Sequence, residues 1–154
     1  MTDSHITIQS ILTPELTLTG VSGSSKKKIL EKISQLIAQQ HPELDEDTIF
    51  NNLLNRERLG STGIGQGIAI PHCRLDESEK VIGALLVLEE KVAFDAIDDA
   101  PVDLLFVLVV PKEATSQHLE LLSQVAEKFN QPDFCAQLRS CKTKEELYHT
   151  VINS

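Results

Sequence analysis

The chain has 154 residues, of which 41% are hydrophobic and 24% charged, so its composition is that of one globular domain able to bury a core. A formal net charge of −9 and an aromatic content of 4% argue against a nucleic-acid partner, because nucleic-acid binders use basic surfaces and stacking aromatics. Three cysteines at irregular spacing indicate neither a disulfide framework nor a cysteine zinc site.

We expect a cytoplasmic protein without membrane insertion. The first ten residues, MTDSHITIQS, lack the basic start and apolar centre of a signal peptide. No apolar run approaches the roughly 20 residues that span a bilayer. Cysteines without a pairing pattern suit a reducing compartment.

The spacing of hydrophobic residues divides the chain into helices and strands. The chain starts with a loose segment at 1–5 and a mixed segment at 6–18 that Pro14 breaks, and two helices follow, one from the 20–25 turn to His41 and one from Asp45 to Gly60. We then expect a short strand at 68–70, strands at 81–88 and 92–94, and a strand at 102–110. The C-terminal part should form a helix from Thr115 or Ser116 to Phe129, a short helix at 133–138 and a last helix from Thr143.

Two features of this pattern define the fold class. Residues 102–110 are nearly all apolar, which predicts a central strand buried on both faces and therefore helices on both sides of a sheet. Helices at both ends of the chain enclose the strands between them. We therefore predict an α/β fold, a layered sandwich that forms a single domain over 1–154. Lys26, Lys27 and Lys28 form a small basic run, which we interpret as the solvated first turn of a helix.

The glycine-rich run from Gly60 to Gly67 has two interpretations. Its backbone amides could form a nest that binds an anion. It is neither a Walker A loop nor a Rossmann fingerprint, because no Gly-Lys-Ser/Thr follows and the next element is a strand. The other interpretation, a loop that turns tightly to enter the sheet, is favoured on glycine content alone.

His72 is the candidate nucleophile. It follows Pro71, which restricts the backbone at the end of a strand. A neutral imidazole is nucleophilic near pH 7, and it can accept a phosphoryl group and pass it on. Such a site needs cationic or amide donors and no metal. A lone histidine is more often structural or exposed, so this interpretation depends on its neighbours.

Four residues could assist His72. Arg56, near the end of the second helix, offers a planar fork of donors, although its spacing and charged neighbours alone favour a solvent-facing arginine. His118 falls in the first turn of a helix, where anions are favoured, or is an ordinary exposed histidine. Ser61 and Thr62 supply hydroxyls for possible loop contacts or simply for the turn. The adjacent Cys73 should point to the opposite face of the chain from His72, so the two should not form a thiol–imidazole pair.

The segment from Asn55 to Leu75, NRERLGSTGIGQGIAIPHCRL, resembles the active-site stretch of the IIA proteins of the bacterial phosphoenolpyruvate-dependent sugar phosphotransferase system, of the fructose/mannitol type. The resemblance continues through FDAIDDAPVDLLFVLVVP at 94–111 and the helix of His118, and so covers nearly the whole chain. The stretches ITIQSIL and VSGSSKKKILEKISQLIA resemble the nitrogen-regulatory branch.

The resemblance implies a mixed β-sheet flanked by helices and a type-2 EIIA domain without a cofactor. His72 matches the histidine that is phosphorylated in the family, and Arg56 and His118 match its phosphate-site arginine and second histidine. The donor would be an HPr-like phosphocarrier, itself charged from phosphoenolpyruvate by an enzyme I-type kinase. Cys73 stands where relatives of this branch often have a small residue, which raises the question of redox sensitivity.

Three functions are compatible with this resemblance. The first is a phosphohistidine phosphocarrier of the nitrogen-regulatory system, whose phosphorylation state controls regulatory target proteins. The second is a sugar-transport component that passes the phosphoryl group to a IIB domain. The third, a pseudo-carrier that binds partners without phosphorylation, is disfavoured by the intact Arg56, His72 and His118. We expect the first, because this sequence contains no IIB cysteine domain and no membrane segment.

Overall fold

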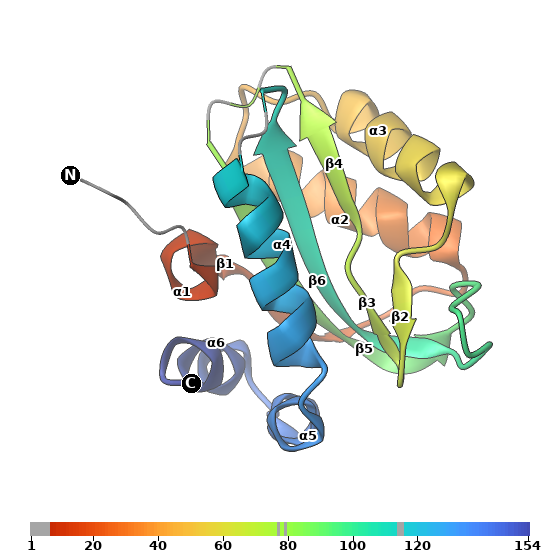
Figure 1. Ribbon diagram of the computed structural model, residues 1–154, viewed down its shortest axis with the longest axis vertical. Helices are drawn as coiled ribbons and strands as arrows, with labels where there is room; N and C mark the ends of the chain where they lie inside the picture. Colours follow the sequence, from red (N-terminus) through yellow and green to blue (C-terminus); the bar gives the residue numbers. More distant parts are fainter. Residues whose placement is uncertain (1–6, 77, 79, 114–115) are drawn as a thin grey trace.

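A computed structural model describes residues 7–76, 78, 80–113 and 116–154. The described strands form one mixed sheet in the order β1-β5-β6-β3-β2, with β4 also paired to β6 (Figure 1). Their bounds are β1 Leu12–Val21, β2 Gly63–Gly65, β3 Ile68–Ala69, β4 His72–Leu75, β5 Ile82–Val92 and β6 Val102–Pro111. Strands β5 and β6 are antiparallel, β1 runs parallel to β5, and β3 and β4 run parallel to β6.

Helices cover both faces of this sheet, as the sequence predicts. On one face, α2 (Lys26–Gln40) and α3 (Glu46–Leu59) bury Ile33 and Leu53 in one core cluster. On the other, α1 (Ile8–Ile11), α4 (Ser116–Phe129), α5 (Pro132–Ser140) and α6 (Lys144–Ile152) form a second cluster around Phe106 and Phe129 (Figure 1). No helix in the described part of the chain is long and apolar enough to cross a bilayer.

Strand β6 lies in the interior of the sheet and has both faces buried, so the prediction for 102–110 is confirmed. Its alternate side chains point to opposite faces, as strand geometry requires. Val107 and Val109 pack with α2 and α3, whereas Phe106 and Leu108 pack with α4. The fold class predicted from the sequence is therefore correct.

Several helix boundaries also agree with the sequence. Ser25 Oγ accepts a hydrogen bond from Lys28 N at 3.2 Å, and His41 follows the end of α2. Asp45 accepts one from Thr48 N at 3.0 Å at the start of α3, and Gly60 follows its end. In α6 the Thr143 side chain caps the first turn. Thr115 lies outside the described residues, so the predicted capping of α4 is not described.

The structure differs from the sequence prediction in four strands. β1 passes through Pro14, which we expected to break the segment at 6–18. Because β1 lies at the edge of the sheet and shifts register between Leu12 and Thr17, the missing N–H of proline is tolerated. β5 is one strand rather than two, since exposed Glu89, Glu90 and Lys91 continue it. β4, at 72–75, was not predicted, and neither was β2, at 63–65, which lies in the glycine run that we interpreted as a loop.

The glycine run forms a hairpin between β2 and β3. Gly65 pairs with Ile68, and the two residues between them, Gln66 and Gly67, have φ of 59° and 81°. Two successive positive φ values match the tight turn preferred in hairpins. A Cβ added at Gly67 would lie 2.8 Å from Arg139 Nη2, so a side chain there would displace the end of Arg139. The tight-turn interpretation of the run is confirmed at these residues.

Strands β3 and β4 lie one after the other along the same edge of β6. β3 pairs with Leu104 and Leu105, and β4 begins with His72 opposite Leu108. Pro71 bridges the two, and its carbonyl accepts a hydrogen bond from Leu108 N at 2.9 Å. This break places His72 at the first position of β4, beside the C-terminal part of β6.

Candidate functional site

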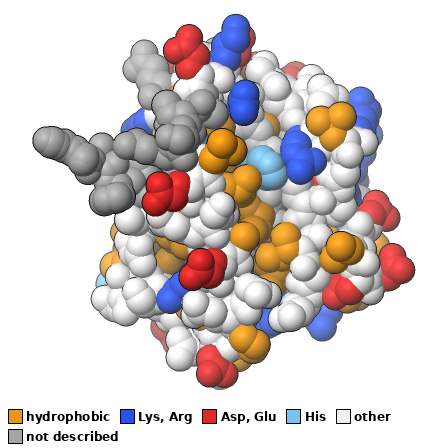
Figure 2. Space-filling model, in the orientation of Figure 1, with side chains coloured by type: hydrophobic (Ala, Val, Ile, Leu, Met, Phe, Trp, Pro, Cys, Tyr) orange, Lys and Arg blue, Asp and Glu red, His pale blue; other side chains and the backbone are white. Residues whose placement is uncertain are grey.

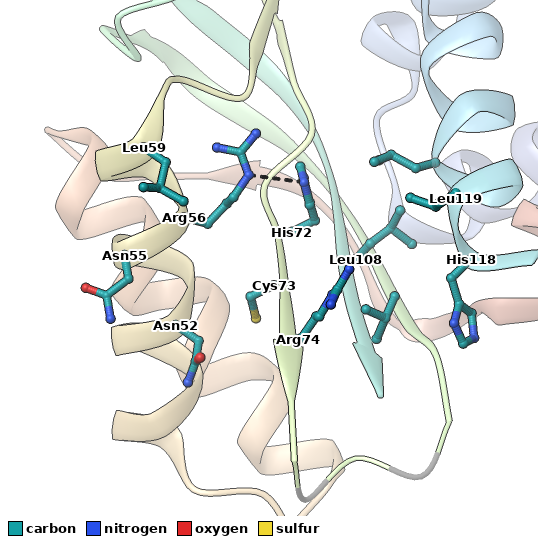
Figure 3. Close-up of a pocket in the computed structure, with 12 residues that line it drawn as sticks. Asn52, Asn55, Arg56, Leu59, His72, Cys73, Arg74, Leu108, His118 and Leu119 are labelled. Atoms are coloured by element: carbon teal, nitrogen blue, oxygen red, sulfur yellow. Dashed lines mark hydrogen bonds between the residues drawn. The ribbon is translucent and has the colours of Figure 1, made fainter. Parts of the chain in front are cut away.

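The His72 ring is held by hydrogen bonds at both nitrogens. Nδ1 lies 2.8 Å from the carbonyl oxygen of Ile70, and Arg56 Nε donates to Nε2 at 3.3 Å (Figure 3). A carbonyl oxygen can only accept, so Nδ1 must carry the proton. Nε2 therefore has the free electron pair of the neutral ring.

The surroundings of His72 favour that neutral ring. Burial lowers its pKa below the ordinary value of 6.5, and the positive charge of Arg56 lowers it further. The hydrogen bond to Ile70 and the charge of Glu57 act in the opposite direction but do not outweigh burial. At neutral pH the imidazole is thus an uncharged nucleophile with its reactive nitrogen defined.

Arg56 occupies the last turn of α3 and faces His72. Its Nη1 donates to Gly60 O at 2.8 Å, at the C-terminal end of the same helix. The three charged residues 56–58 diverge as a helix requires, because successive side chains lie about 100° apart. Glu57 is buried, Arg58 is exposed beside Asn55, and Arg56 is half-buried at the site. The solvent-facing alternative for Arg56 is therefore wrong.

A hollow of about 490 Å³ opens beside His72. One wall is mostly polar and comes from α3 and β4, and the other is mostly apolar and comes from β6 and α4 (Figure 3). Seen from the same side as Figure 1, hydrophobic side chains gather around a hollow that contains a histidine next to a basic side chain (Figure 2). The lining residues besides His72 are Asn52, Asn55, Arg56, Leu59, Cys73, Arg74, Leu108, Val110, His118, Leu119 and Leu122.

His118 lies across the hollow from Arg56, on the first turn of α4. Figure 3 shows its ring at the far end of the hollow, separated from His72 by the side chains of β4 and β6. The structure thus brings His72, Arg56 and His118 to one hollow, with Arg56 in direct contact with His72.

Ser61 and Thr62 do not line this hollow. Ser61 Oγ donates to Phe94 O at 2.6 Å and accepts from Gly63 N at 3.0 Å. Thr62 is buried, and both its amide and its hydroxyl donate to the carboxylate of Glu57. These two hydroxyls therefore hold the loop in its conformation, and a direct contact with a phosphoryl group stays a prediction.

Arg74 is a lining residue that the sequence analysis missed. It lies two positions after His72 on β4 and so on the same face of the strand. It is exposed, and its guanidinium has no hydrogen bond or ion pair with any residue in the described parts of the chain. The alternation of side chains along a strand would have placed Arg74 beside His72, but only if 72–75 had been recognised as a strand.

Cys73 points away from His72, as expected for neighbours on a strand. It packs in the cluster of α2 and α3, and burial raises the pKa of its thiol to about 12. A protonated thiol is a poor nucleophile. Among the described residues no group of three or more His, Cys, Asp or Glu side chains is arranged to hold a metal.

Comparisons with known proteins agree on one family. The sequence profile described as "Phosphoenolpyruvate-dependent sugar phosphotransferase system, EIIA 2" matches residues 10–154. A protein of Pseudomonas aeruginosa named "Nitrogen regulatory protein" is 53% identical over 148 residues, which are 96% of this chain and 96% of that protein. A "PTS system fructose-specific EIIA component" of Haloferax volcanii is 32% identical over 143 residues, covering 92% and 93% of the two chains.

A solved structure has the same fold. The crystal structure of the nitrogen regulatory protein IIA-Ntr from Neisseria meningitidis superposes with a TM-score of 0.88 at 38% sequence identity. The superposition covers 94% of this chain and 98% of that one. The layered arrangement described above is therefore shared across nearly the full length of both proteins.

Proposed function

This chain belongs to the type-2 EIIA family of the phosphoenolpyruvate-dependent sugar phosphotransferase system, and we propose that it is a phosphocarrier that accepts a phosphoryl group on Nε2 of His72 from an HPr-like protein. In its phosphorylated and unphosphorylated forms it would bind regulatory partners differently. The observation that carries this proposal is the tautomer of His72. The Ile70 carbonyl holds the proton on Nδ1, which leaves the Nε2 electron pair beside the Arg56 guanidinium.

The transfer itself exchanges one nitrogen–phosphorus bond for another. The Nε2 electron pair attacks the phosphorus of the donor's phosphohistidine in line with the bond that breaks, and the donor nitrogen keeps the electrons of that bond. The Nδ1 proton stays in place, so the phosphorylated ring is cationic and the Ile70 carbonyl stabilises it. No proton needs to move during this step.

Two guanidinium groups supply the charge that the phosphoryl oxygens need. Arg56 Nε, which donates to Nε2 before transfer, can donate to a phosphoryl oxygen once the new bond forms. Arg74 contributes a second positive charge on the same face of β4. Positioned donors of this kind provide most of the catalysis in phosphoryl transfer, because the transition state spreads charge over the oxygens. His118 and the start of α4 would complete the site from the opposite wall.

Labelling with radioactive phosphoenolpyruvate tests this assignment. In the presence of an enzyme I-type kinase and an HPr-like protein, the chain should take up one acid-labile phosphate. The His72→Ala variant should take up none. A variant that is still labelled would show that the phosphoryl group resides elsewhere and would refute the proposal.

A sugar-transport role is the second candidate. It is supported by the similarity to the fructose-specific component, although at 32% identity this is well below the 53% of the nitrogen regulatory protein. Running the labelling with nitrogen-branch and sugar-branch donors side by side separates the two roles. Faster uptake from the sugar-branch donor, followed by transfer to a IIB domain, would favour transport.

A further inference from the structure

Glu57 is the buried carboxylate nearest to the site, and the transfer step described above makes no use of it. Its side chain is 3% exposed, and its Oε1 lies 2.8 Å from Lys26 Nζ. Thr62 N donates to Oε1 at 3.2 Å, and Thr62 Oγ1 donates to Oε2. A buried carboxylate is costly unless it is paired and hydrogen-bonded, and both conditions are met here.

Lys26 is correspondingly not the solvated residue that we expected. Its ammonium group is also 3.4 Å from Phe94 O and 5.0 Å from the centre of the Phe94 ring. Lys27 and Lys28, the next two residues, are exposed. The first residue of α2 is thus tied to the last turn of α3 and to the segment that follows β5.

The side chains of Glu57 and Arg56 have separate partners. Glu57 points away from Arg56, because successive side chains on a helix lie about 100° apart. With Glu57 turned to Lys26, Arg56 has no ion pair with any carboxylate of the described residues. Its donors go to His72 and Gly60 O instead.

The same ion pair fixes the loop that holds Arg56. Gly60 O accepts from Arg56 Nη1 at 2.8 Å, and only Ser61 separates it from Thr62, which Glu57 holds by two hydrogen bonds. A chain of contacts therefore runs from Lys26 through Glu57 and the loop to Arg56 and ends at His72 Nε2.

We propose that Lys26 and Glu57 are positioning residues for phosphoryl acceptance, which hold Arg56 against Nε2 of His72 through the loop at 60–62. The inference rests on the proposed function. Neither residue lines the hollow, so neither is expected to contact the donor or the phosphoryl group.

The test compares Lys26→Met with Lys27→Met, its exposed neighbour, and with Lys26→Arg, which keeps the charge. With phosphorylated HPr-like donor, Lys26→Met should lower the transfer rate at saturating donor on the order of tenfold, as expected for a displaced catalytic group. The donor concentration for half-maximal rate should not change. Lys26→Arg should recover most of the rate, Lys27→Met should match wild type, and Glu57→Gln should be slowed like Lys26→Met.

NMR spectroscopy of the unphosphorylated protein provides a second readout. The chemical shifts of the Arg56 Nε–H group and of His72 Nε2 should change in Lys26→Met and Glu57→Gln but not in Lys27→Met. Wild-type rates in Lys26→Met, or rate losses that only follow the fraction of unfolded protein, would overturn this inference while leaving His72 phosphorylation intact. A wild-type chain that takes up no phosphoryl group would instead refute the proposed function, and the nitrogen shifts would still decide whether Lys26 positions Arg56.

Discussion

The two walls of the hollow differ in how their side chains are held. On the α3 and β4 wall, Arg56 contacts both Gly60 O and His72, and the loop behind it is fixed by Glu57. On the α4 wall, Leu119 is 63% exposed and has the apolar Leu122 as a neighbour in the lining. Fixed polar groups suit chemistry, whereas an exposed apolar surface suits contact with another protein. We therefore expect substitutions on the first wall to change the rate at saturating donor, and substitutions on the second to change the affinity for donor.

Replacement of Arg56 should have the largest effect. Arg56→Ala removes the only side chain among the described residues that donates a hydrogen bond to Nε2, and loss of one such donor typically lowers rates by about 10²–10³-fold. Transfer reactions quenched at successive times with saturating donor measure this loss. Thermal unfolding of the variant verifies that it is folded. A rate within twofold of wild type would remove Arg56 from the site.

A charge on the α4 wall should have the next largest effect, and it should change the affinity for donor and not the rate at saturating donor. Leu119→Asp places a carboxylate in the apolar surface and should raise the half-saturating donor concentration about tenfold, since an unpaired charge in an interface is costly. The matched control is Ile97→Asp, because Ile97 is 87% exposed and lies outside the lining. Equal effects of the two variants would mean that the α4 wall does not contact the donor.

Arg74→Gln should have a smaller effect on the first wall. It removes one of the two guanidinium groups but leaves Arg56 in contact with His72, so we expect a loss of about threefold to tenfold in rate. Raised salt should diminish the difference between this variant and wild type, because the exposed charge is screened. A loss that is independent of salt would indicate a packing role instead.

The pH dependence should show the smallest effect. Because the folded protein lowers the pKa of His72 below 6.5, the unfolded chain takes up a proton in this range before the folded one does. The contribution of His72 to stability is therefore unaffected above pH 6.5 and becomes unfavourable as the pH falls below it. Chemical unfolding of wild type and His72→Gln between pH 5 and 8 measures this as a flatter profile in the variant. Identical profiles would contradict the lowered pKa.

The sequence predicted those parts of the fold in which local pattern and burial agree. The apolar run at 102–110 could only be an interior strand, and Ser25 and Asp45 are strong helix caps. β1 was missed because Pro14 normally ends a strand. Proline is tolerated here because β1 lies at the edge of the sheet, and that position depends on how the whole sheet is paired. β4 was missed because four residues are too short to show a period.

The site was predictable from the motif and not from the physics of single residues. The spacing of Arg56 alone favoured a solvent-facing arginine, and only the resemblance assigned Arg56 to the same site as His72. Lys26 lies 31 positions before Glu57, so no local periodicity connects them. Long-range ion pairs of this kind become visible only when α2 and α3 are packed together.

The position of His72 at the start of β4 has a consequence for kinetics. Its backbone is fixed by the pairing of β3 and β4 with β6, and its ring by Ile70, before any partner arrives. The entropy of orienting the nucleophile is therefore lost when the protein folds and not at each encounter. Only the incoming phosphohistidine still has to reach a reactive orientation, and its approach should therefore limit the rate of phosphoryl transfer.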